Sequence, residues 1–368
     1  MITYCTNIHP GESWEETFAA LREHIPSVKA SISPDAPFPI GLRLSFRAAE
    51  ELAADGPEQF QVWLRDHDCF VPTLNGFPFG DFHGAPIKGK VYLPDWRSAE
   101  RVDYAIRLAD ILSALLPDGT TGSVSTVPVG LKGVVTNDHL PLVSRNLSSV
   151  LRHLHGIHRN HGRKIMLALE PEPGCLLETT AEVRDFFGRM EVGSELREYL
   201  GICLDCCHQA VEFEEPEECL AMLSEAGIAL AKVQISSALR MVDPDYAILR
   251  QFVEDSYLHQ VVIRRRNGTL ERYIDLPNAL DGHRREPGDE WRCHFHLPLS
   301  YAGSREIGTT RPFPEKLIPL LPAGTLLEAE TYTWGVLPPH LRRGTLIESI
   351  ISELNWLKEQ RNAPHRRP

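Results

Sequence analysis

The chain has 368 residues, 42% of them hydrophobic, which is enough to bury one large core or two ordinary ones. Its formal net charge of −12 argues against nucleic acid as the main partner, because binding phosphates requires a basic surface. The N-terminus lacks the pattern of a signal peptide, and no apolar run approaches the ~18 residues of a transmembrane segment. Eight cysteines in so long a chain do not indicate a disulfide scaffold. We therefore expect a soluble, cytoplasmic protein with reduced thiols.

Strand-like runs alternate with helical segments along the chain. In the first half, the pattern predicts strands at 2–8, 39–45, 69–75 and 122–130. It predicts helices at 13–24, after the second strand through Trp63, at 95–116 and at 138–161, where Asp138 is the expected N-cap. In the second half, continuous apolar runs predict strands at 164–174, 201–208, 230–237 and 324–334, followed by a helix near 340–360. Such alternation is typical of an α/β fold with a parallel sheet. We predict a (β/α)8 TIM barrel rather than a doubly wound sheet, because no G-x-G-x-x-G follows the first strand.

A barrel of this kind needs about 250 residues, so about a third of the chain must be additional. We expect a single domain at 1–360 with insertions at 75–94 and 255–300, followed by a disordered tail at 361–368. The second insertion contains two β-like runs around Asn267-Gly268, a sequence typical of a type I′ hairpin turn. A third β-like run, 291–299, completes this inserted β-hairpin region.

Polar side chains gather at the C-terminal ends of the last four predicted strands, where such barrels carry their chemistry. The two-residue period of a strand places the following pairs each on one face: Glu170 and Glu172, Cys203 and Asp205, Lys232 and Gln234, and Glu328 and Glu330. If these faces point inward, carboxylates meet at one mouth, and such a cluster is costly unless a cation neutralises it. We therefore predict a divalent metal bound by two glutamates, an aspartate and neutral ligands. Any one of these glutamates alone is more often a salt-bridge partner or a helix cap.

The stretch GICLDCCHQA at 201–210 holds three cysteines beside Asp205 and His208. A structural zinc site usually has a second pair of cysteines or two histidines at set spacing, and neither lies nearby. We therefore interpret the cysteines as packing residues, with metal binding by their thiolates as the alternative. Lys232 should lie one layer deeper than Gln234 and form a buried ion pair with a neighbouring glutamate. His294 and His296 alternate on one side of a strand-like run, as either a structural pair or metal ligands.

Together these motifs resemble a known superfamily. The glutamate of LALEPEPG, the D-x-x-H of LDCCH, a polar residue on strand seven and a glutamate on strand eight are similar to the xylose-isomerase-like TIM barrels. That superfamily includes sugar isomerases, ketose 3-epimerases and apurinic endonucleases. Four longer motifs, TYCTNIHPGESW, NGFPFGDFHG, VYLPDW and LEAETYTWGVLP, more narrowly resemble the EboE group of metabolite traffic proteins, over nearly the whole chain.

The resemblance implies a divalent metal (Mg, Mn or Zn) held by Glu170, Asp205 and Glu330, with Glu172 and Glu328 as alternative glutamates. It implies that His208 binds either the substrate or a metal, and that Arg240 binds the substrate. Gln234 stands where the epimerases have a histidine ligand, which favours Mg or Mn unless His296 replaces it. The residues expected to wall the mouth are His9, Asn75, Phe77, Phe79, Phe82 and Trp334.

Three functions remain open at this point. The first is a metal-dependent isomerase or epimerase acting on a sugar, a sugar phosphate or another oxygen-rich metabolite, in which Glu170 and Glu330 move a proton through an enediolate and His208 assists. The second is a non-catalytic, EboE-type protein that binds a metabolite and works with other proteins of its pathway. The third is a metal-dependent phosphodiesterase or endonuclease, which the acidic charge opposes.

Overall fold

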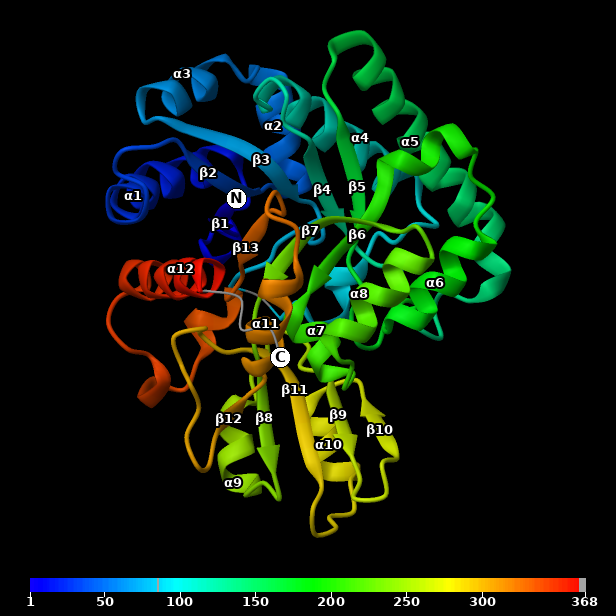
Figure 1. Cartoon of the computed structure of the whole chain (residues 1–368), viewed down its shortest axis with the longest axis vertical. Helices are drawn as coiled ribbons and strands as arrows, with labels where there is room; N and C mark the ends of the chain where they lie inside the picture. Colours follow the sequence, from blue (N-terminus) through cyan, green and yellow to red (C-terminus); the bar gives the residue numbers. More distant parts are fainter. Residues whose placement is uncertain (85, 364–368) are drawn as a thin grey trace.

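The computed structural model describes residues 1–84 and 86–363, and eight parallel strands in it form a nearly closed barrel surrounded by helices (Figure 1). This confirms the predicted TIM barrel. The strand order is β1-β13-β7-β6-β5-β4-β3-β2, and a bridge between Cys5 and Gly41 brings the two end strands together. The barrel strands are Ile2–Tyr4 (β1), Phe38–Arg43 (β2), Cys69–Asn75 (β3), Gly122–Thr126 (β4), Ile165–Leu169 (β5), Leu200–Asp205 (β6), Ala229–Ile235 (β7) and Leu327–Ala329 (β13).

Helices cover the outside of the barrel, and several begin with a capping box, such as Ser13 with Glu16 in α1. Asp138 is not the N-cap predicted for α5. It lies inside a 3-10 turn, because the chain already turns at Thr136, and α5 begins only at Leu140. The α-helices are Trp14–Ile32 (α1), Phe46–Asp55 (α2), Glu58–Asp66 (α3), Ala99–Leu115 (α4), Leu140–His161 (α5), Thr180–Arg189 (α6), Cys206–Val211 (α7), Pro216–Glu225 (α8), Tyr246–Leu249 (α9), Leu276–Gly282 (α10), Pro312–Leu317 (α11) and Leu346–Asn362 (α12). The 3-10 helices are Thr6–Ile8 (η1), Lys88–Tyr92 (η2), Asn137–His139 (η3), Ser194–Tyr199 (η4), Arg250–Phe252 (η5), Ile318–Leu320 (η6), Tyr332–Val336 (η7) and Pro339–Leu341 (η8).

A second, antiparallel sheet is inserted between β7 and β13 and extends from one end of the barrel (Figure 1). Its order is β10-β9-β11-β8-β12, and it has its own apolar core around Phe252, Trp291 and Phe295. The insertion around 255–300 is therefore confirmed, but the sheet is wider than predicted, because β8 and β12 lie outside that range. The strands are Ala238–Val242 (β8), Val261–Arg264 (β9), Leu270–Tyr273 (β10), Glu290–His296 (β11) and Gly308–Thr309 (β12).

The hairpin between β9 and β10 forms as predicted, but with a different turn. Arg265 accepts a hydrogen bond from the N–H of Gly268 (2.9 Å) and donates one to the carbonyl of Thr269 (2.8 Å). Gly268 has φ +87°, whereas Asn267 has no positive φ, so the type I′ prediction is wrong. The Asn267 side chain instead accepts from the N–H of Thr269 (3.0 Å), which stabilises a three-residue loop with glycine in the left-handed position.

The inside of the barrel contains a buried ion pair. Lys232 Nζ of β7 lies 2.6 Å from Glu328 Oε2 of β13, and neither side chain is exposed, which confirms the ion pair predicted for Lys232. Burial alone would lower the pKa of Lys232, but the adjacent Glu328 carboxylate outweighs it and raises that pKa. Gly41 of β2 makes room for this pair, because a Cβ at this position would lie 1.9 Å from Glu328 Oε1 and 2.7 Å from the carbonyl oxygen of Tyr4.

Glu353 of α12 fastens the end of the barrel to the insertion, and its protonation should affect stability. Its Oε1 accepts from the N–H of Leu299 (2.7 Å) and from Thr331 Oγ1 (2.8 Å), and burial raises its pKa from 4.5 to about 7. The folded chain therefore binds a proton more tightly than the unfolded chain, and the stability from this group is lost as the pH rises from 4.5 through 7. Glu353→Gln mimics the protonated acid. In urea titrations, we expect the variant and the wild type to have the same free energy of unfolding at pH 4. At pH 8, the free energy of unfolding of the variant should be higher by up to about 3 kcal/mol. An equal difference at both pH values would contradict this assignment.

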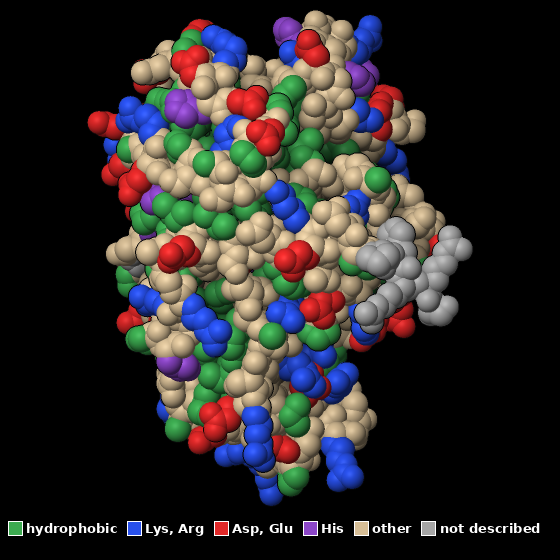
Figure 2. Space-filling model, turned by 60° about the vertical axis from the view of Figure 1, so that its left-hand side comes forward, with side chains coloured by type: hydrophobic (Ala, Val, Ile, Leu, Met, Phe, Trp, Pro, Cys, Tyr) green, Lys and Arg blue, Asp and Glu red, His purple; other side chains and the backbone are tan. Residues whose placement is uncertain are grey.

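The surface shows charges of both signs. On the face drawn in Figure 2, Lys and Arg side chains gather at the lower end, where the second sheet lies, and acidic and basic side chains mix above it. Within residues 1–84 and 86–363, no helix combines the length and the apolar character that crossing a membrane demands. Residues 361 and 362 belong to α12, and residues 364–368 of the predicted tail lie outside the described residues.

Candidate metal centre

Three predicted carboxylates meet at the C-terminal end of the barrel. Glu170 follows β5, Asp205 ends β6 and Glu330 follows β13. One oxygen of each lies within 4.8 Å of the others, and all three residues are buried. The period of two along each strand and the parallel register bring these side chains from separate parts of the sequence to one place.

The hydrogen bonds of these carboxylates leave oxygen atoms free. Asp205 Oδ1 accepts from Ser236 Oγ (2.6 Å) and from the N–H groups of Cys207 (2.7 Å) and His208 (3.1 Å), while Glu330 Oε1 accepts from Asn7 Nδ2 (2.8 Å). Asp205 Oδ2 and Glu170 Oε2 are buried without a hydrogen-bond partner among the described residues. Buried oxygens of this kind are costly unless something binds them, and a divalent cation with oxygen ligands fits the set.

The electrostatics of the cluster also favour a cation. Burial raises the pKa of Glu170 to about 8, and burial together with Glu170 and Asp205 raises the pKa of Glu330 well above its usual range. Burial alone would raise the pKa of Asp205 too, but His208 and His296 lower it below its ordinary value. Without a cation, the two glutamates therefore hold protons near neutral pH, and binding a divalent ion must displace these protons.

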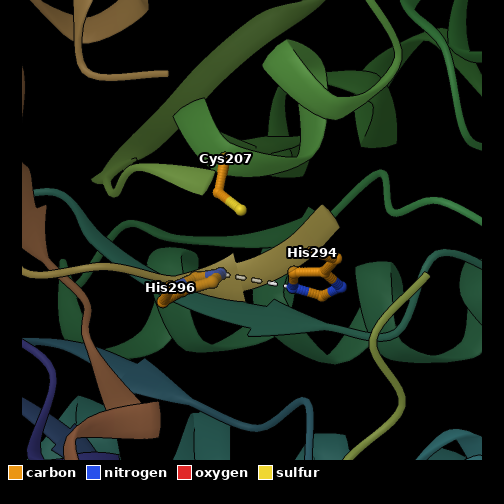
Figure 3. Close-up of side chains that lie close together, drawn as sticks. All are labelled: Cys207, His294 and His296. Carbon is orange, nitrogen blue, oxygen red and sulfur yellow. Dashed lines mark hydrogen bonds between the residues drawn. The ribbon is translucent and has the colours of Figure 1, made fainter. Parts of the chain in front are cut away.

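Histidines from two elements border the carboxylates. His208 lies on α7, whereas His294 and His296 lie on β11 of the second sheet. Ring nitrogens of His208 and His296 and an oxygen of Asp205 lie within 4.8 Å of one another. Figure 3 shows the close contact between His294 Nε2 and His296 Nε2 (3.2 Å), with the sulfur of Cys207 turned toward the two rings. Strand β11 thus supplies imidazoles where β7 has only Gln234.

Gln234 lies beside the carboxylates, in register with Asp205 on β6 and Glu328 on β13. Its Oε1 accepts from Cys203 Sγ (3.2 Å), and its Nε2 is buried without a partner among the described residues. Amide oxygen and nitrogen are distinguished only by their partners, so the opposite orientation would offer the oxygen as a ligand. Metal ligation by Gln234 stays a prediction.

The other predicted residues lie in different places. Asn75 lines the pocket, and its Nδ2 lies 3.3 Å from Glu330 Oε1. Arg240 does not line the pocket, because it lies on β8 and pairs with Glu290 (2.7 Å). His9 also lies outside the pocket, where its Nε2 forms a hydrogen bond with Tyr4 Oη (2.9 Å). Trp334 lies outside it too and lines a separate hollow on the surface. Of the predicted aromatic wall, Phe77 and Phe82 line the pocket, whereas Phe79 stacks on Phe46.

The carboxylates open into a pocket of about 520 Å³, including its opening to solvent. Two segments cover it and are tied together, since the N–H groups of Ile87 and Lys88 both donate to the carbonyl of Ser256 (2.9 Å). Lys88 Nζ also binds Asp275 Oδ2 (2.8 Å) and the carbonyl of Glu254 (2.8 Å). The lining residues that the sequence did not indicate include Asn7, Tyr92, Tyr257 and Tyr332. Asn7 and Tyr332 follow the ends of strands, which was the available signal.

Comparisons with known proteins agree on the fold. The sequence matches no protein-family model, and no curated protein sequence is significantly similar to it. Among solved structures, a xylose isomerase-like TIM barrel protein from Mycobacterium smegmatis in complex with magnesium has a TM-score of 0.55 at 12% identity, covering 98% of this chain and 96% of that one. An L-ribulose 3-epimerase has a TM-score of 0.52 at 12% identity, covering 100% of this chain and 99% of that one. The probable 3-DHS dehydratase AsbF of Bacillus anthracis has a TM-score of 0.53 at 12% identity, covering 97% of this chain and 98% of that one. The chain therefore has the fold of the xylose-isomerase-like TIM barrels.

Proposed function

We propose that the protein is a divalent-metal-dependent isomerase or epimerase of a small, oxygen-rich metabolite. The observation that carries this proposal is the convergence of Glu170, Asp205 and Glu330, with two unpartnered oxygens, beside a pocket that Glu170 and Glu330 line. These three residues would hold the metal, with Gln234 or one of the neighbouring histidines as a neutral ligand. When bound, such an ion acidifies a C–H next to a carbonyl and stabilises the resulting enediolate. The similarity to an epimerase and to a magnesium-bound barrel supports this reading.

The chain supplies two glutamates for proton transfer. Glu170 has one free oxygen, and Glu330 is oriented by Asn7 and Asn75, so the two carboxyl groups can remove and return a proton on the substrate. His208 is fixed by its contact from Nδ1 to the carbonyl oxygen of Pro171 (2.8 Å) and lines the same pocket, so it would lie beside a bound substrate. The segments tied at Ser256 line the pocket above these groups and would limit the access of bulk water to them.

The lining indicates which substrates fit. Phe77, Phe82, Tyr257 and Tyr332 form apolar walls above the carboxylates. Lys88 is the single lysine or arginine among the lining residues that the structure describes, and Asp275 already neutralises it. Among these lining residues, a phosphate group would therefore have no unpaired lysine or arginine side chain to bind. We therefore favour an unphosphorylated sugar or a cyclic compound with adjacent oxygens over a sugar phosphate.

Solvent isotope exchange tests the proposal. We would incubate the protein with Mn²⁺, Mg²⁺ or Zn²⁺ and a panel of unphosphorylated ketoses in D₂O, and we expect deuterium at the carbon next to the carbonyl. Glu170→Gln and Glu330→Gln should slow this exchange by 10²–10⁴-fold, the usual contribution of a general acid or base. Glu353→Gln, a buried glutamate outside the pocket, is the matched control and should keep wild-type exchange.

A carrier that binds a metabolite without converting it is the second candidate. The observation that favours it is Gln234, an amide where the similar epimerases are expected to use imidazole. In the same experiment, saturable binding of a ketose without deuterium incorporation under any of the three metals would favour the carrier and reject the isomerase.

A further inference from the structure

Three histidines beside the carboxylates share one feature, the way in which their Nδ1 atoms are bonded. His208 Nδ1 lies 2.8 Å from the carbonyl oxygen of Pro171, and His296 Nδ1 lies 2.9 Å from that of Glu330. His294 Nδ1 lies 2.7 Å from Gln260 Oε1, an oxygen whose identity is fixed because Gln260 Nε2 donates to the carbonyl of Pro173 (2.9 Å). Carbonyl oxygens only accept, so each Nδ1 must carry the hydrogen.

The other ring nitrogens then face one another as acceptors. His294 Nε2 lies 3.1 Å from His208 Nε2 and 3.2 Å from His296 Nε2. In the neutral rings none of these three nitrogens carries a hydrogen, so their lone pairs converge with nothing between them. All three residues are buried, which makes this arrangement unfavourable unless a positive charge is bound there.

The two distances from His294 Nε2, to the Nε2 atoms of His208 and of His296, match the distance between imidazole nitrogens bound to one metal ion. Zinc binds histidine nitrogen at 2.0–2.1 Å in a tetrahedron, which places two ligand nitrogens about 3.3 Å apart. Histidines that bind metals also usually donate their second N–H to a carbonyl or carboxylate, as all three rings do here. We propose that His208, His294 and His296 bind a second divalent cation of the zinc type, distinct from the cation of the carboxylate group.

The two cation sites adjoin but differ in chemistry. The carboxylate group of Glu170, Asp205 and Glu330 offers oxygen, which suits Mg²⁺ or Mn²⁺, whereas the histidine group offers nitrogen, which suits Zn²⁺. Asp205 is near both, since its oxygen also lies within 4.8 Å of ring nitrogens of His208 and His296. His294 and His208 line the pocket, so the second ion would face the same substrate.

An additional proton is the rival explanation. A protonated His294 could donate to both neighbours through its Nε2, and Tyr332 Oη, 3.4 Å away, could also take part. A single N–H on His294 Nε2 would have to be shared between two acceptors, so at most one of the two contacts would be a full hydrogen bond. If His208 were protonated instead, its Nε2 could donate a hydrogen bond to His294 Nε2. The lone pairs of His294 Nε2 and His296 Nε2 would still face each other.

Metal counting in the full-length protein separates the two sites. We expect metal-free wild type to bind two equivalents of Zn²⁺, measured by elemental analysis after gel filtration, and only one of Mg²⁺, measured by calorimetry. His294→Ala should lose one Zn²⁺ and keep Mg²⁺ binding, whereas Glu330→Gln should keep one Zn²⁺ and lose Mg²⁺. Bound at this site, Co²⁺ should give an intense visible d–d spectrum in wild type and in Glu330→Gln, but not in His294→Ala.

Folding is checked by thermal unfolding of the metal-free proteins. His294→Ala should stay folded without metal and should lose the shift in Tm that Zn²⁺ causes at the histidine site. His155→Ala, a histidine on α5 outside the pocket, is the control and should bind two Zn²⁺. One Zn²⁺ in wild type that Glu330→Gln removes and His294→Ala keeps would overturn the histidine site and leave the proposed function standing. Two Zn²⁺ in His294→Ala would overturn it as well.

Discussion

Replacing Lys232 by methionine is expected to lower the free energy of unfolding by about 3–5 kcal/mol, as is typical when one partner of a buried ion pair is removed. Glu328 would keep a negative charge inside the barrel, where its Oε1 already has no hydrogen-bond partner among the described residues. Urea unfolding at pH 7 measures the effect.

The double variant Lys232→Met with Glu328→Gln is the control, because it removes both charges while keeping the volume of both side chains. We expect it to recover most of the stability that the single variant loses, since two neutral groups no longer carry the cost of a buried charge. A double variant that is as unstable as Lys232→Met would mean that packing of the lysine stem, and not charge, accounts for the loss.

Replacing Asp205 by asparagine is expected to weaken divalent metal binding at least 100-fold while leaving the fold intact. The asparagine oxygen can still accept from Ser236 and from the two N–H groups at the start of α7, so the cap of this helix survives. The amide NH₂ replaces the unpartnered Oδ2 and offers no ligand. Isothermal titration with Mn²⁺ measures the affinity.

Asp205→Ala provides the comparison that separates the two roles of this residue. It should lose metal binding too, and in addition about 1–3 kcal/mol of unfolding free energy, because the N–H groups of Cys207 and His208 lose their acceptor. Wild-type Mn²⁺ affinity in Asp205→Asn would reject Asp205 as a metal ligand, whatever the stability of the alanine variant.

Strand pattern alone predicts the barrel and the meeting of its carboxylates. The two-residue period groups the polar side chains on one face of each strand, and parallel register brings those faces to one end of the barrel. The choice of Glu170, Asp205 and Glu330 among these carboxylates came from the resemblance to the xylose-isomerase-like barrels. The same reasoning could not place Arg240, because the chain leaves the barrel after β7 to form β8 of a second sheet. No local pattern indicates that a strand will pair outside the barrel.

The positions of His9 and Trp334 depend on the 3-10 turns η1 and η7, whose direction is set by tertiary contacts and not by hydrophobic period. The sequence did indicate that His294 and His296 share one side of a strand. It could not indicate that β11 would bring them to His208, because the contact joins α7, the helix after β6, to a strand of the second sheet.

The hydrogen bonds from Ile87 and Lys88 to Ser256 have a consequence for how molecules reach the pocket. They join the connection between β3 and α4 to the connection before β9, although four of the eight barrel strands lie between them in the sequence. The two connections are therefore held together, so movement of one must either break these hydrogen bonds or carry the other with it. Residues 87, 88, 257 and 258 of the two connections line the pocket, so its shape depends on the second sheet as well as on the barrel.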